Sequence, residues 1–170
     1  MRPSLDCPVR VFALILSMIL AGCRFDPFTA VYTRTQPKRE DLIGKYVPDD
    51  ATRTFLTRLR AYSGREPSIL VSADGTLTME NIPDSWLTGF GEPVGGFDSG
   101  QARWTVRKHQ DWWVIGVTYD SAAHISARQH SIWSFGTKLF LIGEKPPYKI
   151  HLTVVDPDSG RGMDFVRSRG

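Results

Sequence analysis

Two short apolar runs on either side of an Asp-Gly pair constrain the fold of this chain more than any other feature. Ile69-Leu70-Val71 and Leu77-Thr78-Met79 flank the tetrapeptide Ala73-Asp74-Gly75-Thr76. Asp-Gly between apolar runs is a strong signal for a tight turn that joins two antiparallel strands. The segment therefore predicts a β-hairpin and directs the fold towards antiparallel β structure.

Further strand signals recur at short spacing along the chain. Leu42–Val47 predicts a first strand that stops at Pro48. Other strands are expected at 102–108, 112–119, 131–135, 139–142, 148–155 and 163–167, with polar turns at 109–111 and 156–160. These signals predict a mainly β fold: an antiparallel meander of about eight strands, either closed as a barrel or folded as a sandwich. We favour the barrel.

Two interruptions of the strand pattern are also predicted. A helix is expected near residues 50–62, because Asp49 or Asp50 can accept backbone N–H groups as an N-cap. Apolar residues recur there at helical spacing until Gly64, namely Phe55, Leu56, Leu59 and Tyr62. The stretch from residue 89 to residue 100 holds five glycines and one proline and predicts a long loop.

The first 22 residues have the anatomy of an export signal. Arg2 and Arg10 precede a run from Val11 to Gly22 that carries no ionisable side chain. This run has 12 residues and is soon followed by Arg24, whereas a membrane-spanning helix needs about 20 apolar residues. A permanent membrane span is therefore not expected.

The tetrapeptide Leu20-Ala21-Gly22-Cys23 closes this run and resembles the lipobox of bacterial lipoproteins. The resemblance implies cleavage before Cys23 and attachment of diacylglycerol to its thiol. Two or three acyl chains would anchor the protein to the membrane of the bacterial cell envelope almost permanently. Arg24, where an aspartate would favour the inner membrane of enteric bacteria, implies the outer membrane facing the periplasm. The alternatives are a secretory signal with a coincidental cysteine and an uncleaved anchor.

The chain thus divides into a signal peptide at 1–22, a lipidated cysteine and tether at 23–40, and a single β-rich domain at 41–170. Residues 24–39 contain two prolines and no sustained apolar period, which is typical of a flexible tether. Several apolar side chains leave open the alternative that this segment docks on the domain or the lipid interface; they are Phe25, Phe28, Val31 and Tyr32.

The order of three motifs in the expected domain resembles lipocalin-like domains of small uncharacterised bacterial lipoproteins. The motifs are Gly44-x-Tyr46, then Asp74-Gly75-Thr76, then the aromatic strand around Trp104. The resemblance implies a barrel, and it brings no catalytic residues to carry over.

Cysteine and charge content exclude several functions. Cys7 would leave with the signal peptide and lipid would occupy Cys23, so the mature chain would have neither a disulfide nor a reactive thiol. Loss of Arg2, Arg10 and Asp6 lowers the formal net charge from +3 to about +2. The basic residues are scattered along the chain, so a nucleic acid partner is not expected.

No catalytic, metal or cofactor site is predicted. Neither a Gly-x-Ser-x-Gly elbow nor a Ser-x-x-Lys pair occurs after residue 23. The four histidines form no His-x-x-x-His motif; they are His109, His124, His130 and His151. The glycine-rich stretch at 89–95 misses the dinucleotide spacing and contains Pro93. We therefore do not expect an enzyme.

Aromatic residues give the one positive indication of binding. Trp86, Phe90 and Phe97 are candidates to line the barrel mouth and bind a hydrophobic ligand. Trp112 and Trp113 are neighbours on a predicted strand, so one ring is expected to be buried and the other to lie outside or against another element. An exposed ring can anchor a partner protein. The alternative is that the tryptophans only fill the core.

Two functions remain open on the sequence. The first is a binding module for a hydrophobic ligand or envelope component, which would need an enclosed apolar cavity. The second is an interaction protein of the envelope, such as an inhibitor, an immunity protein or a scaffold. That function is compatible with a filled core and a protruding loop.

Overall fold

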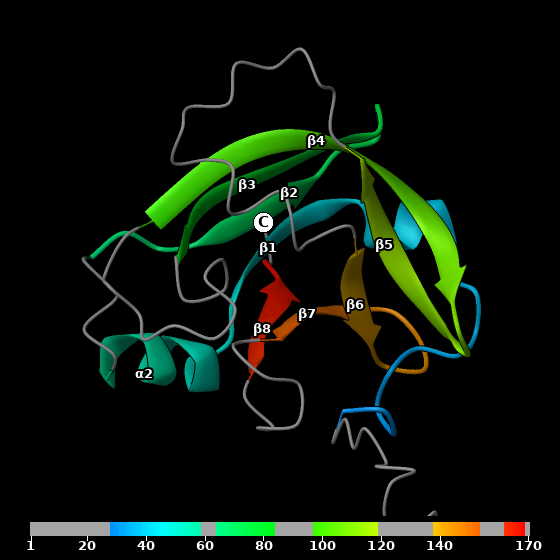
Figure 1. Cartoon of the computed structure of the whole chain (residues 1–170), viewed down its shortest axis with the longest axis horizontal. Coiled ribbons are helices and arrows are strands. Elements are labelled where there is room, and N and C mark those ends of the chain that lie inside the picture. Colours follow the sequence, from blue (N-terminus) through cyan, green and yellow to red (C-terminus); the bar gives the residue numbers. More distant parts are fainter. Residues whose placement is uncertain (1–27, 59–63, 84–96, 119–137, 154–161, 169–170) are drawn as a thin grey trace, which may run out of the picture.

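A closed antiparallel β-barrel is the central feature of the computed structural model, which describes residues 28–58, 64–83, 97–118, 138–153 and 162–168 (Figure 1). The order of the strands around the ring is their order along the chain. Among these residues, the predicted mainly β meander, its closure as a barrel and the early α-helix are confirmed. The eight strands are β1 (Gly44–Pro48), β2 (Ser68–Val71), β3 (Thr76–Pro83), β4 (Phe97–His109), β5 (Trp112–Thr118), β6 (Lys138–Ile142), β7 (Lys149–Thr153) and β8 (Gly162–Arg167).

The first and last strands pair and close the ring. Tyr46 of β1 lies opposite Arg167 of β8, and Pro48 lies opposite Phe165. Leu42, expected in the first strand, instead belongs to a 3-10 turn, η1 (Arg39–Leu42), which leads into β1. The strand predicted at 131–135 and the turn at 156–160 lie outside the described residues.

Helix α2 (Asp50–Arg58) follows β1 and lies beside β8 and β1 (Figure 1). Its N-cap is Asp49, one of the two predicted caps: the Asp49 carboxylate accepts the N–H of Thr52 at 2.9 Å. The Asp49 carbonyl accepts the N–H of Arg53 at 2.9 Å. Thr52 and Leu56 form the buried face of the helix. The predicted continuation to residue 62 falls on residues 59–63, outside the described part.

The β2–β3 hairpin forms at the predicted Asp-Gly turn. Gly75 has φ +90°, a conformation that favours glycine. Asp74 supports the turn because its carboxylate accepts the N–H of Thr76 at 2.8 Å. The N–H of Ser72 then donates to the carbonyl of Thr76 at 2.9 Å and begins the ladder between the strands.

Strand β4 begins at Phe97, so the long loop predicted over 89–100 is wrong for residues 97–100. Strand β3 runs on to Pro83, which pairs with Phe97. The register between β3 and β4 shifts between Met79 and Ile82. At this β-bulge Asn81 has φ +52°, and its N–H donates to the Ser99 hydroxyl at 2.9 Å. Tertiary pairing with β3 thus overrides the local loop signal of the glycines.

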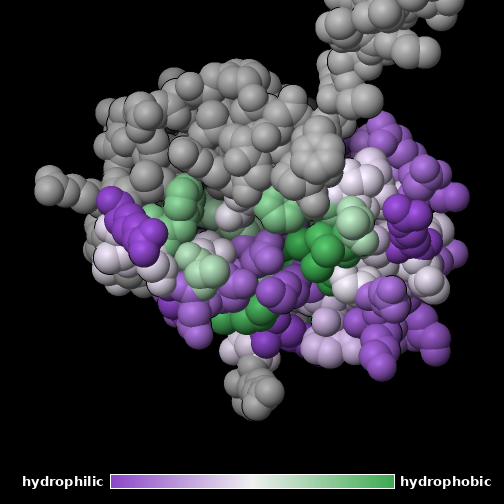
Figure 2. Space-filling view, turned by 90° about the horizontal axis from the view of Figure 1, so that it is seen from below, coloured by the Kyte–Doolittle hydropathy of each residue, from purple (hydrophilic) through white to green (hydrophobic). Residues whose placement is uncertain are grey.

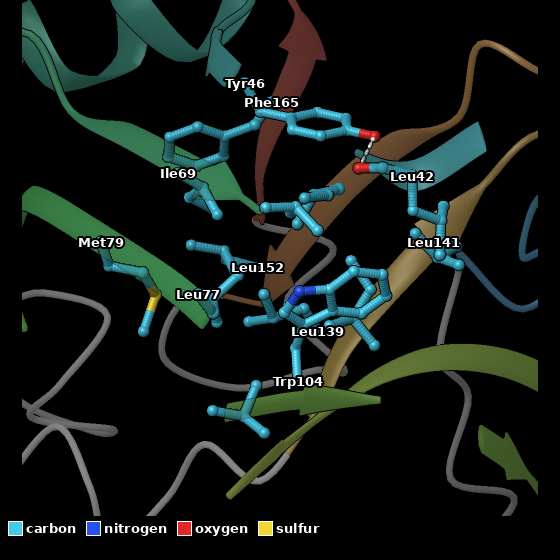
Figure 3. Close-up of a cluster of buried hydrophobic side chains, with 14 of the residues drawn as sticks. Leu42, Tyr46, Ile69, Leu77, Met79, Trp104, Leu139, Leu141, Leu152 and Phe165 are labelled. Atoms are coloured by element: carbon cyan, nitrogen blue, oxygen red, sulfur yellow. Dashed lines mark hydrogen bonds between the residues drawn. The ribbon is translucent and has the colours of Figure 1, made fainter. Parts of the chain in front are cut away.

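Large apolar side chains fill the barrel interior. Figure 3 shows them converging from strands on all sides of the ring. Trp104 is 2% exposed, and Tyr46 and Phe165 are fully buried. The Tyr46 hydroxyl donates to the Leu42 carbonyl at 3.0 Å (Figure 3). The Trp104 indole N–H donates to the Ser72 carbonyl at 2.8 Å. The bulkiest polar aromatic groups of the core are therefore hydrogen-bonded.

The described segment before η1, residues 28–38, lies along the outside of the barrel; we call it the strap. Thr33 holds it in place. The Thr33 N–H donates to the Leu141 carbonyl at 2.9 Å, and the Thr33 carbonyl accepts the Trp113 N–H at 2.8 Å. The Thr33 hydroxyl donates to the Gly143 carbonyl at 2.7 Å. Tyr32 forms an isolated antiparallel β-bridge with Ile142. Residues 28–38 therefore dock on the barrel, as the alternative interpretation of this stretch allowed, and do not form a flexible tether.

Among the described residues, no helix has both the length and the apolar character that crossing a membrane requires.

Candidate functional site

The three residues proposed to bind a hydrophobic ligand are not brought together in the described structure. Trp86 and Phe90 lie outside the described residues. Phe97 is the first residue of β4, is partly exposed and lies opposite Pro83 at the end of β3. A site formed by all three therefore stays a prediction.

The interior of the described barrel is packed with its own side chains. Trp104 lies there with branched aliphatic residues from the facing strands, among them Leu77, Leu139 and Leu152 (Figure 3). Clusters of buried apolar side chains of this kind form ordinary protein cores. The alternative that tryptophans serve the core is confirmed for Trp104. A ligand entering this region would have to displace buried side chains.

Trp112 and Trp113 differ from the expectation that one ring is buried, because both are partly exposed. Trp112 packs outside the barrel against the strap, with 5.3 Å between its ring centroid and that of Tyr32. Its ring also lies 6.4 Å from that of Phe140 on β6 and 6.4 Å from that of His109 on β4. The strap thus supplies a neighbour that the strand pattern did not reveal.

Three basic side chains gather beside these rings. The Lys138 Nζ lies 2.9 Å from the His109 Nε2. A Cβ on Gly116, between β4 and β6, would lie 2.6 Å from the Arg107 Nε, so the Arg107 side chain crosses the outer face of β5 at that glycine. We call this group, together with Trp112 and Phe140, the basic-aromatic surface.

The positive charges of the basic-aromatic surface affect one another. Burial lowers the pKa of His109, and the charges of Lys138 and Arg107 lower it further. Burial and the charge of Arg107 also lower the pKa of Lys138. His109 is therefore neutral at pH 7 and can accept a hydrogen bond from the Lys138 ammonium. The local potential favours an anionic group such as a carboxylate or a phosphate.

A second polar group joins β7, β8 and α2. His151, 1% exposed, places its Nδ1 2.6 Å from the Asp164 Oδ1. Lys149 Nζ lies 3.3 Å from a carboxylate oxygen of Asp49 and 3.6 Å from one of Asp164. The Thr52 hydroxyl accepts the Asp164 N–H at 2.8 Å. These contacts fasten the helix to the barrel.

His151 and Asp164 are as close as the members of a catalytic His-Asp pair, but the distance is the one feature they share with it. The Nε2 of His151 is buried and has no hydrogen-bond partner among the described residues. The ring of Phe28 lies 4.1 Å from the imidazole, centroid to centroid. A general base must reach the proton of its substrate, and this nitrogen is enclosed. The pair therefore has a structural role.

Described residues line two of the hollows on the outside of the barrel. One of about 260 Å³ lies between α2, β8 and the strap and is lined by Phe28, Phe55 and Asp164 among others. Another of about 600 Å³ follows the strap and the end of β6, next to Val31 and Ile142. Figure 2 views the strap side of the molecule and shows hydrophobic side chains among hydrophilic ones.

Within the described ranges, no three His, Cys, Asp or Glu residues lie close enough together to hold a metal ion. No family model, curated protein or solved structure matches the chain. The function must therefore be inferred from the residues themselves.

Sequence reasoning missed the basic-aromatic surface. Arg107 and His109 are separated by one residue, so they share a face of β4, and this part was visible in the sequence. Lys138 joins them only through the register of β5 and β6, which pairs it with Gly116. No local signal gives that register.

Proposed function

We propose that this chain is an envelope lipoprotein, anchored through Cys23, whose barrel binds another protein of the same compartment through its outer surface. Of the two functions that the sequence left open, the interaction protein suits the structure better. The observation that carries this preference is the burial of large side chains in the interior of the described barrel. Trp104, Tyr46 and Phe165 lie there, where a barrel carrier would hold its ligand.

The basic-aromatic surface is the part of the barrel best suited to such a partner. Interface residues that contribute most to affinity are often tryptophan, tyrosine and arginine. Here the ring of the partly exposed Trp112 lies 6.4 Å from that of Phe140, and the Lys138 ammonium lies 5.9 Å from the same Phe140 ring. Charge complementarity then favours a partner that presents carboxylates next to an apolar group.

Native mass spectrometry of the mature protein, gently released from the membranes of its own cells, tests this function. A stoichiometric protein complex is the expected result. Lys138→Glu is expected to remove the complex, because it reverses the charge at the centre of the surface. Lys45→Glu, at an exposed position on β1, is the matched control and is expected to retain it.

A small adduct without a protein partner would instead favour the hydrophobic-ligand function, with Trp86, Phe90 and Phe97 as its candidate residues. Equal capture by both lysine variants would show that the partner binds elsewhere on the barrel.

The anchor has a test of its own. Cys23→Ser is expected to leave the chain unprocessed and without lipid, whereas the unchanged protein is expected to be heavier than the cut polypeptide and to partition into detergent. The same mass and partitioning for both proteins would rule out the lipobox.

A further inference from the structure

The strap joins the chain to one particular side of the barrel. Phe28, its first residue, packs on His151 of β7. Tyr32 is 3% exposed and stacks on Phe140 of β6, with 4.6 Å between ring centroids and 15° between their planes. Both contacts lie on the outer surface of the barrel. The chain therefore meets the domain at Phe28, well before β1 begins.

The lipidation site is close to this point in the sequence. Four residues separate Cys23 from Phe28. Because a chain spans at most about 3.6 Å per residue, the Cα of Cys23 lies within roughly 18 Å of the Cα of Phe28. This bound holds for any conformation of the four residues. A free tether from Cys23 to Arg39 would have allowed roughly 58 Å.

The domain is larger than this reach. A compact domain of about 140 residues has a radius of gyration of about 14 Å and hence a diameter of roughly 35–40 Å. A lipidated residue held within about half of that diameter of Phe28 cannot turn the far side of the barrel towards the bilayer. The two sides of the domain are therefore not equivalent.

We propose that the chain holds one fixed side of its barrel, the side of β6–β8 and α2 that carries the strap, against the bilayer in which Cys23 is anchored. The basic-aromatic surface begins at β6, on the border of this side, and extends over β5 to β4, so that its β4 part with Arg107 and His109 stays accessible from the compartment. The inference rests on the proposed lipidation of Cys23. Strand β3 lies four strands from β7 in the ring, so the face of β2–β4 is directed into the compartment (Figure 1).

The surface of the strap side is compatible with a lipid headgroup region. Figure 2 views this side, where apolar side chains are interspersed with polar ones. Val31, in the strap, is 47% exposed and borders the hollow of about 600 Å³ beside Ile142. Leu70 on β2, which is 42% exposed, gives a residue of similar exposure on the opposite side, since β2 lies four strands from β6.

A pair of single-cysteine variants, Val31→Cys and Leu70→Cys, tests the orientation. No native cysteine needs to be removed, because Cys7 would leave with the signal peptide and lipid would block Cys23. The lipidated mature proteins are labelled with a thiol-reactive fluorophore and reconstituted into phosphatidylcholine vesicles that contain a headgroup nitroxide lipid. We expect the label at residue 31 to lose most of its emission and the label at residue 70 to lose little.

An insertion variant distinguishes two possible causes of the orientation: the short chain between Cys23 and Phe28, and an affinity of the strap side for the lipid surface. An insert of about 20 Gly and Ser residues between Pro27 and Phe28 adds a coil of roughly 25 Å root-mean-square length. With this insert, we expect quenching at residue 31 to fall towards that at residue 70. Persistence of strong quenching at residue 31 would show that surface affinity, and not reach, sets the orientation.

The remaining outcomes identify which proposal fails. Protein that floats with the vesicles but is quenched equally at both positions overturns the fixed orientation and leaves the anchor intact. Protein that does not float lacks the anchor, which overturns the inference together with lipidation. Loss of the partner complex is measured separately, so the partner proposal can fail without affecting either result.

Discussion

Gly162 allows the buried imidazole of His151 to lie flat against the outer face of β8. A Cβ at Gly162 would lie within van der Waals overlap of the ring, 2.7 Å from its Nε2. The ring has no free space to enter, because His151 is 1% exposed and Phe28 packs against it. The absence of a side chain at residue 162 therefore determines how closely β7, β8 and the strap approach one another.

Gly162→Ala is expected to lower the free energy of unfolding by about 1–3 kcal/mol, the usual cost of overpacking a filled site. Urea unfolding followed by tryptophan fluorescence measures it. Gly116→Ala is the control: its Cβ would meet the side chain of Arg107, which is exposed and can swing away. Equal losses for the two variants would contradict the proposed tight contact at His151.

Because Tyr46 is buried, the free energy of unfolding of the barrel is expected to fall at alkaline pH. Burial raises its pKa to about 12 from 10.0; the charge of Arg167 lowers it and that of Asp41 raises it by smaller amounts. The folded state therefore holds the Tyr46 proton more tightly than the unfolded chain does. This contribution is complete below about pH 10 and disappears as the pH rises to about 12.

Two pKa units correspond to about 2–3 kcal/mol, which is the expected loss of unfolding free energy over this range. Tyr46→Phe is expected to be less stable at neutral pH by about 1 kcal/mol, since the hydrogen bond to Leu42 is gone. The free energy of unfolding of this variant should nevertheless fall less steeply as the pH rises above about 10. Parallel slopes for the two proteins, measured by denaturant unfolding at a series of pH values, would assign the effect to other groups.

The stability of helix α2 depends more on its N-cap and on its packing against β8 than on the helix propensity of its own residues. It has nine residues, and helices of this length are marginal in isolation. Burial opposes ionisation of Asp49, but the N–H of Thr52 and the charge of Lys149 outweigh it, so the pKa of Asp49 is lowered. Its contribution is present at neutral pH and is lost as the pH falls below the usual range of aspartate.

Asp49→Ala is expected to destabilise the protein by about 1 kcal/mol, a typical value for a lost N-cap. Asp49→Asn keeps a capping oxygen and loses only the ion pair with Lys149, whose partly exposed side chain makes that pair weak. Most of the stability should therefore return in the asparagine variant, as measured by urea unfolding at pH 7. An asparagine variant as unstable as the alanine variant would assign the effect to the ion pair.

The elements that the sequence predicted well are those with local signals. The Asp74-Gly75 turn, the strand spacing and the Asp49 cap all depend on neighbours within a few residues. The strap could not be predicted in this way, because Thr33 bonds to Gly143, 110 residues away. The start of β4 was missed for the same reason, since Phe97 pairs with Pro83 on β3 and not with a residue near it in the sequence.

The candidate site was less predictable than the fold. The sequence indicated that Arg107 and His109 share a strand face, but the register that adds Lys138 depends on two strand pairings. Two of the three predicted ligand residues, Trp86 and Phe90, lie outside the described part. Single-strand patterns predict which side chains are buried, whereas a surface shared by several strands requires their mutual register.

Ring closure gives the described barrel a property that would matter if the proposed lipid anchor concentrated many copies in one plane. Every strand has a hydrogen-bonded neighbour on both sides, including β1 and β8, which pair with each other. An open sheet would offer an edge on which a second copy could extend the ladder, and crowding would favour such growth. The described ring offers no such template, so adjacent copies held by the proposed anchor would share a membrane at high density without polymerising strand by strand.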